Sequence, residues 1–104
     1  MKVKLIRDRL TPTGPGVSIE TVQGPLHVAL LIAKLHEETQ EIADSRCRDV
    51  DEYADALQAL KDLARLHGIG LAEIVAAAAD KEAARGGFLA GRVVVVSGAK
   101  PSNE

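Results

Sequence analysis

The chain has 104 residues and an almost balanced charge, with 13 lysines and arginines against 15 aspartates and glutamates, for a net charge of −2. This length supports one domain with a modest core, and the lack of a basic stripe argues against nucleic acid as the main partner. Only Tyr53 and Phe88 are aromatic, which disfavours a pocket that holds a base by extensive stacking within one subunit.

Cys47 is the only cysteine, so the chain cannot form an intrachain disulfide. No apolar stretch approaches the roughly 20 residues that a membrane span needs, and the start of the chain does not have the pattern of a signal peptide. We therefore expect a cytoplasmic protein that does not contact a membrane. His27, His36 and His67 lack the paired spacing of metal ligands, which favours structural roles for them.

Residues 2–7 alternate polar and apolar side chains, which predicts a short strand. A segment rich in glycine and proline follows and runs to Gly24. Long connections of this kind are often functional, so this one either lies over a ligand site or is a flexible surface loop.

Three helices are expected. Pro25 suits a first helical turn, which predicts a helix over 25–44. A second helix is expected from about 49 to 66, ending at Gly68, and a third over 71–85. Residues 28–33 are apolar on all sides. Three helices of one subunit can hardly cover such a segment, so we expect self-association.

The β-branched run 93–96 predicts a second strand, able to pair with 2–7, and residues 99–104 read as a disordered tail. The expected fold is all-α: a helical hairpin plus a third helix, with short terminal strands. Dimerisation would complete a four-helix-type bundle. Residues 1–98 are expected to form this single domain.

Two acidic pairs mark the predicted hairpin. Glu38 and Glu41 share a face of the first helix, and Glu52 and Asp55 share a face of the second. If the helices fold back on each other, these four carboxylates converge. Such groups repel each other unless a cation lies among them, and Mg²⁺ is the hard ion that prefers oxygen ligands. We expect a Mg²⁺ site at this point.

Glu38 is the most informative of these acids, because at about 100° per residue it falls on one apolar line with Leu31, Leu35 and Ile42. A buried carboxylate must be neutralised, paired or bound to a metal.

The neighbouring acids have simpler explanations as well. Glu52 stands three residues after Asp49, which is close to a capping box. Glu37 is either a solvated helix charge or a partner for Lys34. Neither explanation accounts for Glu38.

Lys81 and Arg85 lie one turn apart on the third helix and can hold the phosphates of a substrate. The alternative is that they only complement the helix dipole.

The whole pattern resembles small members of the all-α nucleotide pyrophosphohydrolase superfamily, which includes the MazG-type house-cleaning enzymes and phosphoribosyl-ATP pyrophosphohydrolase. The likeness spans residues 4 to about 93. It is carried by Lys4-Leu5-Ile6-Arg7-Asp8-Arg9, by Lys34-Leu35 with Glu37-Glu38 and Glu41, by Glu52-Tyr53-Ala54-Asp55, and by Lys81 with Arg85-Gly86-Gly87-Phe88.

The resemblance implies an all-α homodimer or homotetramer that hydrolyses a nucleoside triphosphate, or a related nucleotide, between the α and β phosphates. It implies that Mg²⁺ is bound by Glu38, Glu41, Glu52 and Asp55. A triphosphate carries about four negative charges, which these acids would repel without metal.

Outside that ligand set, Glu37 is expected to act in the outer shell or to activate water. Arg7, Lys34, Lys81 and Arg85 are expected to meet the phosphates. Two alternatives stay open: phosphoribosyl-ATP pyrophosphohydrolase, and a helical dimer without enzymatic activity.

Overall fold

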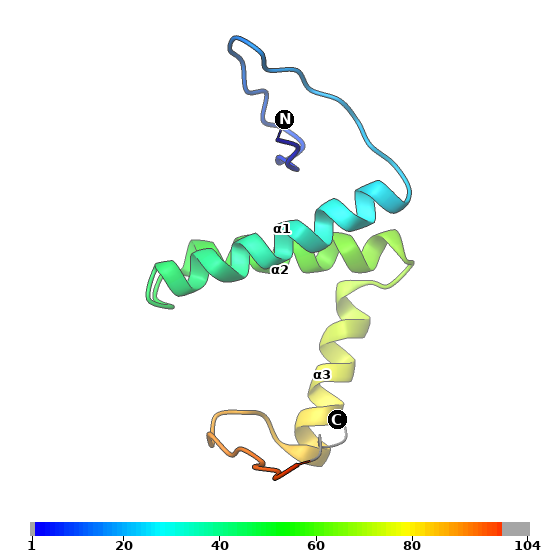
Figure 1. Ribbon diagram of the computed structural model, residues 1–104. Coiled ribbons are helices and arrows are strands. Elements are labelled where there is room, and N and C mark those ends of the chain that lie inside the picture. The colour runs from blue at the N-terminus through cyan, green and yellow to red at the C-terminus, as the bar shows by residue number, and fades with distance from the viewer. Residues whose placement is uncertain (1, 99–104) are drawn as a thin grey trace. The chain divides into compact units, whose positions relative to one another are not determined.

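The computed structural model describes residues 2–98, and the chain divides into two compact units, Met1–Leu71 and Ala72–Glu104. The described part contains the helices α1 (Pro25–Asp44), α2 (Val50–Leu66) and α3 (Leu71–Arg85) (Figure 1). The predicted all-α class is therefore confirmed, and all three helices lie where the sequence predicted them. None of the helices in residues 2–98 combines the length and hydrophobicity needed to cross a lipid bilayer.

Helices α1 and α2 lie side by side as a hairpin in the first unit (Figure 1). Gly24 precedes α1 with a φ of 66°, a value that favours glycine, and Pro25 occupies the first turn. Leu31 of α1 and Ala59 of α2 are buried between the helices. The hairpin therefore has a small apolar core, with much of each helix surface left exposed.

The connection between α1 and α2 is a left-handed turn built without glycine. The N–H of Cys47 donates to the carbonyl of Ile42 at 2.9 Å, and the N–H of Arg46 donates to that of Ala43 at 3.0 Å. This is the Schellman pattern of a helix end. Arg46 and Cys47 have φ values of 59° and 61°. The hydroxyl of Tyr53 donates to the Cys47 carbonyl at 3.0 Å and ties the turn to α2.

Both ends of α2 follow the sequence signals. The Oδ1 atom of Asp49 accepts the N–H of Asp51 at 3.0 Å, which caps the helix start. At the other end Gly68 has a φ of 76°, and the N–H of Ile69 donates to the carbonyl of Ala64 at 3.0 Å. The predicted left-handed exit at Gly68 is thus confirmed.

The predicted terminal strands are not found within residues 2–98. Segment 2–7 is irregular. Val3 and Leu5 of this segment line a cavity together with Leu30 of α1. A helix offers apolar side chains to such a segment but no free backbone groups to form a ladder, so alternation alone does not make a strand here. Segment 93–96 is also irregular and mostly exposed. The tail expected at 99–104 lies outside the described residues.

Candidate functional site

The apolar stripe predicted for α1 exists, and a carboxylate lies in it. Leu31 is 6% exposed and Glu38 only 3%, while Leu35 and Ile42 are half-buried. Among the residues that the structure describes, Glu38 is the one charged residue that is buried. A solvated helix charge would not occupy this position.

Five carboxylates meet at the hairpin in two overlapping groups. Oxygens of Glu37, Glu38 and Glu41 lie within 4.8 Å of one another, and so do oxygens of Glu38, Glu52 and Asp55. Glu38 belongs to both groups, and the other four side chains are half-buried. The predicted convergence of the two acidic pairs is present in the structure.

Two oxygens of this cluster are covered but unsatisfied. Oε1 of Glu38 lies 3.1 Å from Nζ of Lys34, but Oε2 of Glu38 has no hydrogen-bond partner among the described residues. Oε2 of Glu52 is covered in the same way and also lacks a partner there. Covered acceptors without donors are costly. The cluster therefore offers lone pairs to a cation.

The electrostatics of Glu52 reflect the crowding of acids. The neighbouring Glu41 carboxylate, which can share a proton with Glu52, raises the pKa of Glu52 to about 6, and burial, Asp49 and Asp55 act in the same direction. Asp49 caps α2 with its own side chain. The helix start therefore does not need the side chain of Glu52, which lies in the acidic cluster instead.

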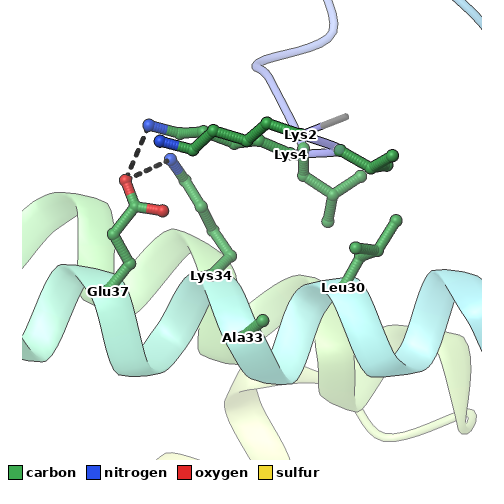
Figure 2. Close-up of a pocket in the computed structure, with 8 residues that line it drawn as sticks. Lys2, Lys4, Leu30, Ala33, Lys34 and Glu37 are labelled. Atoms are coloured by element: carbon green, nitrogen blue, oxygen red, sulfur yellow. Dashed lines mark ion pairs between the residues drawn. The ribbon is translucent and has the colours of Figure 1, made fainter.

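Cations of the same unit surround the acids. The guanidinium of Arg7 pairs with Oδ1 of Asp55. Nζ of Lys4 lies 2.8 Å from Oε1 of Glu37, and Nζ of Lys34 lies 3.7 Å from that same oxygen (Figure 2). Two of the cations expected to meet phosphates, Arg7 and Lys34, thus contact carboxylates in this structure.

The contact between Lys4 and Glu37 changes the proton affinity of both groups. The hydrogen bond from Lys4 lowers the pKa of Glu37 against the opposing effect of burial, and Lys34 and Lys2 lower it further by their charge. The same hydrogen bond raises the pKa of Lys4. Glu37 is therefore ionised and Lys4 protonated at neutral pH.

A groove of about 790 Å³ opens beside the cluster in the first unit. Its wall includes Glu38, Asp55, Arg7 and Lys34 at the acidic cluster, together with other polar side chains. These are Lys4, Asp8, Arg9, His27, Gln58, Asp62 and Arg65. The volume is typical of pockets that hold small molecules.

Sequence reasoning did not assign Lys2 and Lys4 to the site. The signal was available, because the alternation of segment 2–7 places both lysines on one side of an extended chain. Lys81 and Arg85, by contrast, lie on exposed positions of α3 in the second unit, and their predicted role stays a prediction.

No protein-family model matches the chain, and no characterised protein or solved structure shows significant similarity to it. The resemblance to all-α nucleotide pyrophosphohydrolases therefore rests on the residues themselves and stays a prediction.

Proposed function

We propose that this protein is a Mg²⁺-dependent nucleotide pyrophosphohydrolase, which cleaves a nucleoside triphosphate or a related nucleotide between the α and β phosphates. The observation that carries the proposal is Glu38: a buried carboxylate, shared by two acidic groups, with an unsatisfied oxygen. A charge in that position needs partners for both oxygens, and Lys34 contacts only Oε1 among the described residues, which leaves Oε2 for a cation.

The donor set fits a hard divalent cation, because every candidate ligand atom is a carboxylate oxygen. Glu38, Glu41, Glu52 and Asp55 are the proposed ligands. When bound, Mg²⁺ neutralises phosphate charge and lowers the pKa of a coordinated water.

The other residues have proposed roles around the metal and the phosphates. Glu37, kept ionised by its hydrogen bond with Lys4, acts in the outer shell of the metal site. Arg7 of the N-terminal segment and Lys34 of α1 contact the phosphates.

In the reaction, the water oxygen attacks the α phosphorus, and the bond between this phosphorus and the bridging oxygen breaks. The bridging oxygen leaves with the β phosphate, and the proton of the water passes to the solvent. The products are the nucleoside monophosphate and pyrophosphate. The nucleoside occupies the groove, whose lining among the described residues contains no Phe, Tyr or Trp and offers the imidazole of His27 as its one aromatic ring. Hydrogen bonds rather than stacking would therefore select the base.

We also propose that the active form is a homodimer or homotetramer. Val50, Tyr53, Leu57 and Leu60 follow one stripe of α2 and are each at least 40% exposed. This stripe leaves apolar surface for a second copy to bury, and helix pairs from two subunits would form a four-helix arrangement.

The test is a panel of nucleoside triphosphates, oxidised triphosphates and phosphoribosyl-ATP, assayed for pyrophosphate release with Mg²⁺ and with EDTA. We expect Mg²⁺-dependent release from at least one of them. No release from any nucleotide, with no rise in melting temperature on adding Mg²⁺, contradicts the proposal.

One observation favours the alternative of a helical module without activity. Lys4, Lys34 and Arg7 already pair with acids of the cluster, so part of its charge is neutralised without metal. The unsatisfied oxygens of Glu38 and Glu52 favour the enzyme. The same nucleotide panel distinguishes the enzyme from the inactive helical module.

A further inference from the structure

Three lysines converge on one carboxylate beside the acidic cluster (Figure 2). Lys2 and Lys4 reach over α1 from the N-terminal segment, and Lys34 rises from α1 itself. Their shared neighbour is Glu37, whose Oε1 atom lies 2.8 Å from Lys4 and 3.7 Å from Lys34. Lys2 is near enough to act on Glu37 by its charge.

The ammonium groups differ in the carboxylates that they contact. All three face Glu37, and Lys34 also reaches Glu38 at 3.1 Å. Glu38 and Glu41 act on Lys4 by their charge, without an ion pair among the described residues. Each ammonium has three N–H donors. Lys4 can therefore keep its contact with Glu37 and still donate to another anion.

The lysines line one part of a small open cavity of about 100 Å³, and the apolar side chains of Val3, Leu5, Leu30 and Ala33 line the rest. Pockets that hold whole organic ligands are several times larger, at about 300 to 1,000 Å³. The three ammonium groups gather at the Glu37 end of this cavity (Figure 2), where they can bind a compact anionic group such as a phosphate as point charges.

The cavity adjoins the proposed metal ligands. Glu37 lines the cavity and belongs to one acidic group with Glu38 and Glu41. Lys4 and Lys34 line both this cavity and the larger groove. A polyphosphate that reaches the carboxylates from the groove would thus place its far end among the lysines.

We propose that Lys2, Lys4 and Lys34 bind the pyrophosphate end of the substrate, and that Lys34 exchanges Glu38 for a phosphate oxygen once Glu38 ligates a metal ion. This assignment rests on the proposed function. Under this assignment Mg²⁺ and pyrophosphate bind cooperatively, because Lys34 stays paired with Glu38 until a metal ion replaces Lys34 as the partner of this carboxylate.

The experiment is calorimetric titration of the full chain with inorganic pyrophosphate in excess Mg²⁺. Lys4→Gln should weaken pyrophosphate binding by about tenfold or more, the loss of one charge-assisted contact. Lys4→Arg should retain most of the affinity. Lys61→Gln, which removes the same charge from α2 away from both cavities, should match the wild type.

A titration with Mg²⁺ alone provides the second readout. Lys4→Gln should bind Mg²⁺ at least as tightly as the wild type; a parallel loss of Mg²⁺ affinity would mean that Lys4 only positions Glu37, and would overturn the assignment. Equal pyrophosphate affinity in Lys4→Gln and wild type, or no binding by the wild type in Mg²⁺, also overturns the assignment.

Pyrophosphate binding that depends on Lys4, without hydrolysis across the nucleotide panel, would support the lysine site while contradicting the proposed enzyme.

Discussion

Lys34 and Glu38 form an ion pair one turn apart on α1, with 3.1 Å between Nζ and Oε1. The glutamate side chain is 4% exposed and the lysine side chain 25%. Oε1 of this buried carboxylate meets Lys34, while Oε2 has no partner among the described residues. The stability of the hairpin and the proposed affinity for Mg²⁺ therefore depend on the same few atoms.

Lys34→Gln should destabilise the metal-free protein by about 1–3 kcal/mol, because it leaves the Glu38 charge covered without a cation. Urea unfolding in EDTA measures the effect. The double variant Lys34→Gln with Glu38→Gln should recover most of the loss, since no buried charge then remains. Simple additivity of the two single substitutions would show that the pair is not coupled.

Glu38→Gln should abolish the rise in melting temperature caused by Mg²⁺ and reduce pyrophosphate release by at least about 100-fold, because it removes the carboxylate shared by both acidic groups. Differential scanning fluorimetry and a pyrophosphate assay provide the two readouts. Glu20→Gln, in the exposed loop, is the matched control. Wild-type release by folded Glu38→Gln protein would remove Glu38 from the ligand set.

The pH dependence of stability in EDTA should report Glu52. The folded-state pKa of Glu52 is about 6, against an ordinary value of 4.5. Between pH 4.5 and about 6 the folded state binds more protons at Glu52 than the unfolded state does. The contribution of Glu52 to the free energy of unfolding is therefore lost as the pH rises through this range. Glu37 has a lowered pKa and acts oppositely, losing its contribution only as pH falls below 4.5.

The urea concentration at the midpoint of unfolding, measured from pH 4.5 to 7, tests this predicted direction. Wild-type stability relative to Glu52→Gln should decrease as pH rises, because glutamine does not ionise. Parallel curves for the two proteins would mean that Glu52 does not titrate in this range.

Local signals in the sequence were sufficient for the helices and for the acidic cluster. Pro25, Asp49 and Gly68 mark helix ends by backbone chemistry that neighbouring residues satisfy. Glu38 could be assigned to the interior because helical periodicity alone places it on the same face of the helix as Leu31. These features require no knowledge of distant contacts.

The N-terminal segment could not be predicted in the same way. Whether alternating residues form a strand depends on a partner with free backbone groups, and segment 2–7 meets the side chains of α1 instead. The pairs Lys4–Glu37 and Arg7–Asp55 join residues far apart in sequence. Only the folded arrangement reveals that these cations face the acids.

The turn after α1 offers a test of backbone strain. Arg46 has a φ of 59°, and a left-handed conformation costs a non-glycine residue about 1 kcal/mol. Arg46→Gly should therefore stabilise the protein by up to about 1 kcal/mol, less the entropy that glycine loses on folding. Urea unfolding measures the change. Arg46→Ala is the control, since alanine removes the side chain but keeps the strain, and equal stability of the two variants would contradict this explanation.

The exposed stripe on α2 predicts the oligomeric state. Leu57 and Leu60 are 47% and 40% exposed, so burying the exposed part of each in a dimer contributes about half of what a fully buried leucine does, roughly 0.7–1.4 kcal/mol. Leu57→Glu should weaken self-association about tenfold or more, because it removes this contact and also places a charge in the interface, as measured by sedimentation velocity over a concentration series. Val17→Glu places the same charge on an exposed apolar position of the loop and should not change the distribution. A wild-type protein that sediments as a monomer at all concentrations, or a Leu57→Glu protein that dimerises as strongly as wild type, would exclude this stripe as the interface.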